Sequence, residues 1–297
     1  MTPATAAAIG AAIEAASGRP FVVASSRPVG GGSIHRSCEV SDGRTRYFVK
    51  LNDPAAAAMF AAEADGLHAL ASTAAIRTPA VVASGTSADA AFLVLEHIEL
   101  HGLDANAGSR LGAALARLHR VTGDRYGWHA DNFIGATPQH NAFHHDWPWF
   151  FGARRLRPQL DMARRNGMDK ALAARGEAIV ERVGALFLEY RPAPSLLHGD
   201  LWSGNAASDA SGAPVIFDPA CHYGDREADL AMAELFGGFP LSFYAAYRAA
   251  WPLDPGYETR KPLYNLYHVL NHFNLFGGAY LGQARRMIEG LDASLRR

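Results

Sequence analysis

The chain has 297 residues, of which 49% are hydrophobic and 19% are charged, and its formal net charge is −1. This length permits one large two-lobed domain or two ordinary ones, and the composition is that of a globular protein. The balanced charge predicts no nucleic-acid partner and no membrane surface, and no apolar run is long enough to cross a membrane. Two cysteines, Cys38 and Cys221, give no disulfide framework, so we expect a reduced, cytoplasmic setting.

The first hundred residues predict a small sheet with two helices. Thr2 as N-cap, Pro3 as first helical residue and Gly18 as terminator favour an opening helix over a signal peptide. Apolar runs bounded by turn residues predict antiparallel strands, and a second helix follows the third of them. The expected strands are residues 21–24, 34–40, 46–51, 81–83 and 91–95, the second helix is 53–71, and the hinge that follows is 96–99.

The rest of the chain is expected to be mainly helical. Leu111, Leu115 and Leu118 recur at helical spacing, whereas residues 123–150 are too rich in Gly, Pro and Asn for a regular element. Further helices are expected at about 150–166, 169–190, 225–236, 240–250 and 258–290.

The segment between the second and third of these helices carries the most chemical information. Asp200 follows an apolar run and precedes Asn205 by five residues, and Asp218 ends the apolar run 215–217. Phosphoryl transfer from ATP in kinase-like folds needs a carboxylate facing the acceptor hydroxyl, and an amide and a second carboxylate that hold magnesium. We therefore predict Asp200 as the catalytic base and Asn205 and Asp218 as Mg²⁺ ligands, with His198 as a loop brace.

These motifs, placed after a sheet and a hinge, predict the fold class. We expect an α+β, bilobal protein-kinase-like fold with a five-stranded antiparallel N-lobe and a mainly helical C-lobe. The ATP-binding lobe is expected to span residues 1–99 and the catalytic and substrate lobe residues 100–297.

A second set of residues is expected to bind ATP. Glycines between two strands let backbone N–H groups approach phosphates, although a flexible hairpin turn is the alternative. A lysine inside an apolar strand and a glutamate on the next helix suit the pair that fixes the phosphates. Adenine is expected to meet the backbone at the hinge. The predicted cofactor-binding residues are Gly30, Gly31, Gly32, Ser33, Lys50, Glu63, Glu96 and Ile98.

The acceptor site is less clearly marked. Trp202, next to the catalytic motif, is a candidate for stacking on a sugar, and Asp225 and Glu227 are candidates for facing the substrate. Acidic residues at a helix N-terminus also have a plain structural explanation, and Asp229 suits a brace for the catalytic loop. The His-rich segment 129–146 matches no zinc pattern, and a polar surface loop is the favoured interpretation.

Longer stretches extend the kinase motif. Residues 197–205 read Leu-His-Gly-Asp-Leu-Trp-Ser-Gly-Asn, and residues 223–232 read Tyr-Gly-Asp-Arg-Glu-Ala-Asp-Leu-Ala-Met. Shorter matches lie at 30–34, 48–50, 93–96, 111–119, 131–135, 137–139 and 217–220. In these stretches the chain resembles the fructosamine kinase (ketosamine 3-kinase) family, a branch of the aminoglycoside phosphotransferase-like kinases.

The resemblance implies ATP- and Mg²⁺-dependent phosphorylation of the sugar 3-hydroxyl of ketosamines, either free ribulosamines or fructosamines or those on glycated protein amines. The 3-phosphate then decomposes and frees the amine, which is deglycation repair. Some relatives carry a Cys in the glycine loop that is linked to redox-sensitive dimerisation, and Ser33 in that place puts such regulation in doubt. The residues decide neither the preferred ketosamine nor the oligomeric state.

Two other functions stay open at this point. A kinase of an aminoglycoside or choline would use the same core, although a polycationic acceptor favours a strongly acidic C-lobe, and acids and bases there are near parity. A non-catalytic kinase-fold binding protein is the alternative from another class. The presence of Lys50, Asp200, Asn205 and Asp218 together argues against it.

Overall fold

The computed structural model describes residues 1–30 and 34–296, and its first part is an antiparallel sheet. Within the described residues this sheet has five strands, as the sequence predicted, and their order is β1-β2-β3-β5-β4. The strands are β1 (Ser25–Val29), β2 (Arg36–Ser41), β3 (Arg46–Asn52), β4 (Val81–Thr86) and β5 (Ala91–Glu96).

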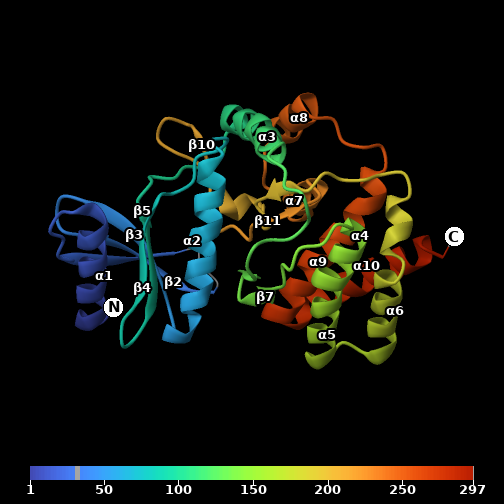
Figure 1. Ribbon diagram of the computed structural model, residues 1–297, viewed down its shortest axis with the longest axis horizontal. Coiled ribbons are helices and arrows are strands. Elements are labelled where there is room, and N and C mark those ends of the chain that lie inside the picture. Colours follow the sequence, from blue (N-terminus) through green and yellow to red (C-terminus); the bar gives the residue numbers. More distant parts are fainter. Residues whose placement is uncertain (31–33, 297) are drawn as a thin grey trace.

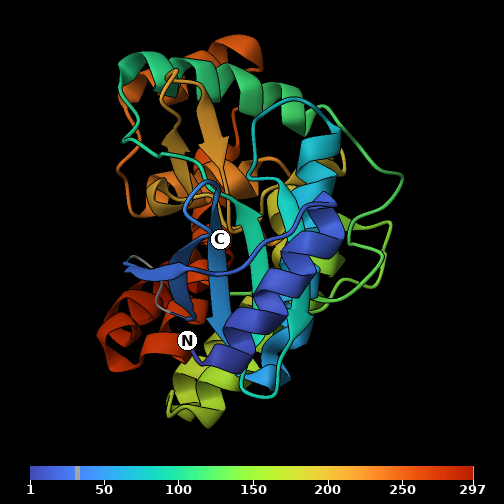
Figure 2. The same ribbon diagram turned by 90° about the vertical axis from the view of Figure 1, so that its left-hand side faces the viewer.

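Helices α1 (Pro3–Ser17) and α2 (Ala57–Ser72) lie on opposite faces of this sheet, with α2 on the side of the helical part (Figure 1). Figure 2 shows α1 running obliquely across the outer face. Because side chains alternate along a strand, β3 presents Val49 to the core under α1 and Lys50 to the α2 side. The lysine therefore faces the second part of the molecule.

The opening helix begins and ends as predicted. The Thr2 hydroxyl accepts a hydrogen bond from the Thr5 N–H at 3.2 Å, and Gly18 ends the helix at φ 68°. The strand expected at residues 21–24 is wrong, because pairing with β2 begins only at Ser25. Phe21 instead packs into the core with α1, so its hydrophobicity reflects burial and not strand pairing.

The second part is mainly helical and begins with α3 (Ala105–His119). The other helices are α4 (Trp147–Phe151), α5 (Arg157–Arg165), α6 (Lys170–Val180), α7 (Glu227–Leu235), α8 (Leu241–Ala250), α9 (Tyr257–Phe276) and α10 (Leu281–Ser294). Two-stranded antiparallel sheets lie among them and pair β6 (Asn132–Ile134) with β7 (Thr137–Gln139), β8 (Ser195–Leu197) with β11 (His222–Gly224), and β9 (Ala206–Ser208) with β10 (Pro214–Ile216). The lobe boundary near residue 100 stays a prediction.

Three expected elements differ from the structure. Segment 123–150 contains the β6–β7 hairpin and the start of α4, and segment 169–190 is helical only to Val180 before a short 3₁₀ turn. The single helix expected over 258–290 is two helices, since Gly277 takes a φ of 83° that stops α9. A positive φ is readily adopted by glycine and breaks the helical path.

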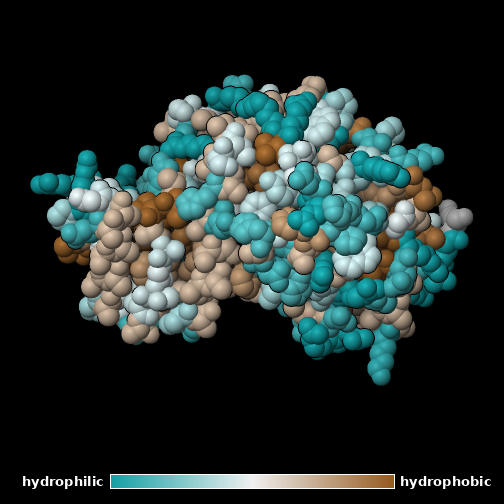
Figure 3. All heavy atoms as spheres, viewed as in Figure 1, coloured by the Kyte–Doolittle hydropathy of each residue, from teal (hydrophilic) through white to brown (hydrophobic). Residues whose placement is uncertain are grey.

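The surface differs between the two parts of the molecule. On the face shown in Figure 3, weakly hydrophobic side chains gather over the sheet-bearing part, where α1 and α2 are rich in alanine, and hydrophilic ones predominate over the helices. In the part of the chain that the structure describes, no helix combines the length and the hydropathy needed to span a bilayer.

Candidate active site

The loop that follows β8 is shaped by one buried carboxylate. The backbone N–H groups of His198 and Gly199 each donate to a different oxygen of Asp229, on α7, at 2.8 Å. Gly199 has a φ of 84°, and a Cβ there would lie 2.1 Å from the carbonyl oxygen of Ala220. Only glycine fits this position, so the sequence His-Gly-Asp positions the next residue, Asp200.

His198 is a brace within this loop. Its Nε2 lies 2.9 Å from the Phe217 carbonyl oxygen, and the N–H of Asp200 donates to its Nδ1 at 3.3 Å. Complete burial lowers the pKa of His198, so the ring is neutral and uses both nitrogens for structure. This leaves Asp200 as the group available to take a proton.

Asp200 and Asn205 lie against each other. The Asn205 side-chain Nδ2 donates to the Asp200 carbonyl oxygen at 3.0 Å and approaches its carboxylate Oδ2 at 3.4 Å. Burial, together with the charges of Asp218 and Asp229, raises the pKa of Asp200 to about 7. A carboxylate with a pKa near neutrality suits general-base chemistry.

Lys50 joins the two parts of the molecule. Its Nζ donates at 2.5 Å to Glu63 on α2 and at 2.5 Å to Asp218, and the residue is 2% exposed. Burial alone would lower the pKa of Lys50, but the charges of Asp218 and Glu63 outweigh it and raise the pKa. Burial would likewise raise the pKa of Asp218, but Lys50 holds it below its ordinary value.

Glu63, the other carboxylate that contacts Lys50, differs from Asp218 in the direction of its pKa shift. Its pKa is raised, first by burial and also by the charge of Asp218, although Lys50 opposes both. Both carboxylates contact the ammonium at the same distance of 2.5 Å. Three groups that the sequence predicted from separate segments meet at one point.

Asp218 and Asn205 could together hold a divalent cation. The Phe217 N–H donates to the Asn205 carbonyl oxygen at 3.1 Å, which places the two segments side by side. Asp218 takes a φ of 58°, uncommon outside glycine, and its side chain is 36% exposed. With Asn205 Nδ2 turned to Asp200, the amide oxygen and the Asp218 carboxylate are the hard ligands that Mg²⁺ prefers beside phosphate oxygens.

The glycine-rich segment lies mostly outside the described residues, because Gly31, Gly32 and Ser33 do not belong to them. Gly30 is exposed at the end of β1. Ile34, directly after the loop, reaches the β6–β7 turn, where a Cβ on Gly135 would lie 2.6 Å from its Cδ1. Ile34 thus contacts the helical part of the molecule.

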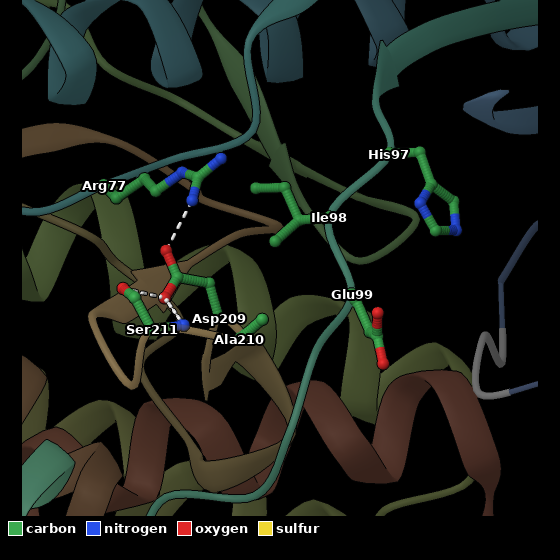
Figure 4. A pocket seen from close by; sticks show the side chains of 7 residues that line it. All are labelled: Arg77, His97, Ile98, Glu99, Asp209, Ala210 and Ser211. Atoms are coloured by element: carbon green, nitrogen blue, oxygen red, sulfur yellow. Dashed lines mark hydrogen bonds and ion pairs between the residues drawn. The ribbon is translucent and has the colours of Figure 1, made fainter. Parts of the chain in front are cut away.

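The hinge borders a pocket of about 310 Å³ that is not the phosphate site, since neither Lys50 nor Asp218 lines it. Figure 4 shows the Ile98 side chain pointing toward Arg77 and Asp209, with His97 and Glu99 turned to the other side. The residues that line the pocket are Arg77, His97, Ile98, Glu99, Asp209, Ala210 and Ser211.

The backbone of the hinge is only partly free for adenine. The Glu96 N–H donates to the Ala80 carbonyl oxygen at 2.8 Å, and the Glu96 carboxylate accepts from Arg77 at 2.6 Å. Glu96 can therefore contact adenine only through its carbonyl oxygen. The role of Ile98 stays a prediction.

Asp225 and Glu227 do not face solvent. Both residues are 0% exposed. The Asp225 carboxylate accepts hydrogen bonds from the hydroxyls of Tyr264 at 2.6 Å and Tyr190 at 3.0 Å. The Glu227 carboxylate binds the Arg260 guanidinium through two contacts of 2.8 and 2.9 Å. Their carboxylates are committed to packing the start of α7, so this structure gives them a structural role and no access to a sugar.

An aromatic patch, which the sequence analysis did not single out, lies beside the catalytic loop. It consists of Phe236, His272, Phe276 and Tyr280, with ring centroids 4.8 Å apart for Phe236–His272 and 5.1 Å for His272–Tyr280. Gly238 lies against Ser203, where a Cβ would be 2.3 Å from the hydroxyl oxygen. A sequence signal existed, because Phe-Gly-Gly stands at the C-terminal end of both α7 and α9, at 236–238 and 276–278.

Trp202 is also exposed near this patch. Its ring lies over Gly204, where a Cβ would be 2.2 Å from the indole, and the residue is 39% exposed. Among the described residues, no group of three or more His, Cys, Asp or Glu side chains is arranged to hold a metal, and this includes the His-rich segment 129–146.

Comparison with known proteins gives a consistent result. The family model described as fructosamine kinase matches residues 5–294. A protein named "Probable ketoamine kinase" from Synechocystis is 48% identical over 93% of both chains. The chloroplastic protein-ribulosamine 3-kinase of Arabidopsis thaliana is 41% identical over 88% of this chain and 80% of its own.

Solved structures agree at the level of the fold. A fructosamine-3-kinase candidate from Haemophilus somnus is 30% identical, with a TM-score of 0.88 over 95% of this chain and 96% of its own. The aminoglycoside phosphotransferase APH(4)-Ia, solved with AMP-PNP and hygromycin B, is 15% identical, with a TM-score of 0.62 over 97% of this chain and 98% of its own. The second likeness concerns the fold alone.

Proposed function

The chain belongs to the fructosamine kinase family and is a phosphotransferase of that family, and from this premise we propose that it transfers the γ-phosphate of Mg²⁺-ATP to the sugar 3-hydroxyl of a ketosamine. The observation that carries the proposal is one cluster: Asp200 lies against Asn205, and Asp218 and Glu63 each lie 2.5 Å from Lys50. These are the groups that phosphoryl transfer requires, brought together from four segments.

Each residue has a distinct task in this reaction. The Asp200 carboxylate orients the acceptor hydroxyl and takes its proton, while the hydroxyl oxygen forms a bond to the γ-phosphorus and the bond to the β–γ bridging oxygen breaks. Lys50, held by Glu63, binds the phosphates. Asn205 and Asp218 would hold Mg²⁺, which neutralises charge on the phosphate oxygens when it is bound.

The acceptor is proposed to be a ribulosamine or a fructosamine, free or attached to a protein amine. The relatives named ketoamine kinase and ribulosamine 3-kinase support this class. The exposed aromatic patch and Trp202 suit a sugar with a single amine cation, since aromatic faces stack on apolar sugar faces and on cations. Phosphorylation at the 3-hydroxyl destabilises the adduct and frees the amine, so the proposed role is deglycation repair; the cytoplasmic setting stays a prediction.

The proposal is tested by measuring ATP consumption and product phosphorylation with a panel of acceptors. A ribulosamine, an erythrulosamine and a fructosamine are compared with kanamycin and choline at equal concentration. We expect phosphorylation of at least one ketosamine at its 3-hydroxyl and poor turnover of kanamycin. Strong phosphorylation of kanamycin or choline with inert ketosamines would replace the acceptor class and retain the phosphoryl-transfer chemistry.

Mg²⁺-ATP is expected to raise the thermal midpoint of unfolding. A ligand that binds only the folded chain stabilises it by about 2.7 kcal/mol at a hundred times its dissociation constant. The measurement is a thermal-shift titration with ATP, with and without Mg²⁺. An unchanged midpoint at millimolar ATP, with the protein shown to be folded, contradicts nucleotide binding between the two parts.

Truncating Trp202 to Ala is expected to raise the KM for the ketosamine by roughly tenfold and to leave the KM for ATP within about twofold, since stacking contributes on the order of 1–2 kcal/mol to binding. Steady-state kinetics with each substrate varied in turn measures this. A matched control is Trp149→Ala, because Trp149 is 46% exposed on α4. Equal increases in both KM values for Trp202→Ala would show that the ring supports the loop and not the acceptor.

A further inference from the structure

Two acidic residues of helix α2, Glu63 and Asp65, make different polar contacts. Glu63 binds Lys50 of the sheet, whereas the Asp65 carboxylate accepts a hydrogen bond from the Trp128 indole Nε1 at 2.7 Å. His129 Nε2 lies 3.3 Å from the same oxygen of Asp65. The helix that positions the catalytic lysine is therefore tied by its next acidic residue to the second part of the molecule.

The far end of this tie is rigid. Trp128 is 8% exposed, its backbone N–H donates to the Asn141 carbonyl oxygen at 2.9 Å, and its ring centroid lies 5.4 Å from that of Tyr223 on β11. The preceding residue, Gly127, exchanges backbone hydrogen bonds with Tyr223 at 2.9 and 2.8 Å. The indole N–H is thus a fixed donor.

The middle of α2 also touches the segment that carries Asp218. A Cβ on Gly66 would lie 3.2 Å from Pro219 Cγ and 3.3 Å from Cys221 Sγ, so the helix backbone lies directly on this segment. A small shift or rotation of α2 would therefore change the position of Glu63 relative to both Lys50 and Asp218.

We propose that Asp65 is a positioning residue for the phosphoryl transfer, a proposal that rests on the function proposed above. Its hydrogen bond to Trp128 holds α2 where Glu63 reaches Lys50, so it acts on nucleotide binding through the Lys50–Glu63 pair. Hydrogen bonds to charged groups are among the stronger ones in proteins. If the Asp65 side chain turned toward solvent, the buried indole N–H of Trp128 would be left without this acceptor.

The test is a double-mutant cycle on the full-length protein. Asp65→Ala is expected to weaken Mg²⁺-ATP binding by about tenfold, the effect of losing one hydrogen bond to a charged group. Trp128→Phe removes the donor and keeps an aromatic ring, and it is expected to act in the same direction. The control is Glu14→Ala on the exposed face of α1, which is expected to change nothing.

The decisive arm places Asp65→Ala in a Glu63→Gln background. Because Asp65 acts through Glu63, adding Asp65→Ala to the Glu63→Gln variant is expected to cause no further loss of nucleotide affinity, which titration calorimetry measures. An equal loss in both backgrounds overturns the proposal, as does a lower thermal midpoint with unchanged ATP affinity, which would mark Asp65 as a purely structural residue.

The two proposals fail separately. If the wild-type protein binds Mg²⁺-ATP but phosphorylates no ketosamine, the proposed acceptor is wrong. The proposal for Asp65 can still be tested in that case, because the double-mutant cycle measures nucleotide affinity. A wild-type protein that binds no Mg²⁺-ATP overturns both.

Discussion

Replacing Asp200 with Asn is expected to lower kcat by at least about a hundredfold and to leave the affinity for Mg²⁺-ATP near its wild-type value, because general-base contributions are typically ~10²–10⁴. Asn has the shape of Asp but cannot take the hydroxyl proton. The hydrogen bond from Asn205 to the backbone carbonyl of residue 200 is retained, and the Lys50–Asp218 contact is untouched. Steady-state kinetics and calorimetric ATP titration measure the two effects. Turnover above roughly a tenth of wild type would remove Asp200 as the base.

The pH profile gives an independent test of the same assignment. Burial, Asp218 and Asp229 raise the pKa of Asp200 to about 7, and only the ionised carboxylate accepts a proton. kcat/KM of the wild-type protein is therefore expected to rise as the pH increases through about 7 and to be lower at more acidic pH. The Asn variant is expected to lose this rise, whereas a rise that persists in the variant belongs to another group.

The sheet was predictable from the sequence because its strands carry local signals. Short apolar runs that include aromatic residues mark β3 and β5, and the hairpin turn at Asp42-Gly43 joins β2 to β3. The first strand was misplaced because Phe21 and Val23 are hydrophobic for packing under α1, which a local pattern cannot distinguish from strand pairing. The break of the last long helix at Gly277 was also missed, although the pair Gly277-Gly278 is a signal for the end of a helix.

Part of the candidate site was predictable, because its residues occur in a characteristic order and spacing along the chain. The spacing of Asp200, Asn205 and Asp218 pointed to one place, and the structure brings Lys50 and Glu63 to it. What the local sequence could not supply is contact between distant segments. The aromatic patch combines residues from the ends of α7 and α9, and the hydrogen bond from Trp128 to Asp65 joins residues 63 positions apart.

Asp225 and Glu227 show the opposite error. Their acidic side chains near a motif looked available for an amine substrate, yet Arg260, 33 positions after Glu227, and the hydroxyls of Tyr190 and Tyr264 occupy them. Whether an acid faces solvent depends on its neighbours in space, and a sequence pattern shows only its neighbours in the chain. Burial of a charged group is sustained by such partners, which lie far away along the sequence.

Replacing Asp218 with Asn is expected to fail in a different way from the Asp200 variant. Its carboxylate lies 2.5 Å from Lys50 and is a proposed ligand of Mg²⁺, so the substitution removes one charge from both contacts. We expect the Mg²⁺ concentration for half-maximal activity to rise by at least about tenfold, the scale of one lost charged contact, together with a large loss of kcat. The Asp200→Asn variant is expected to keep its Mg²⁺ dependence.

The difference between the two variants follows from what remains in each site. Without the Asp218 carboxylate, Lys50 keeps one of its two carboxylate contacts, that with Glu63, and the proposed metal site loses a ligand. Activity is measured as a function of Mg²⁺ at saturating ATP, with Asp161→Asn on α5 as a surface control. An unchanged Mg²⁺ dependence in the Asp218 variant would assign the metal to other oxygens and leave Asp218 as a partner of Lys50 alone.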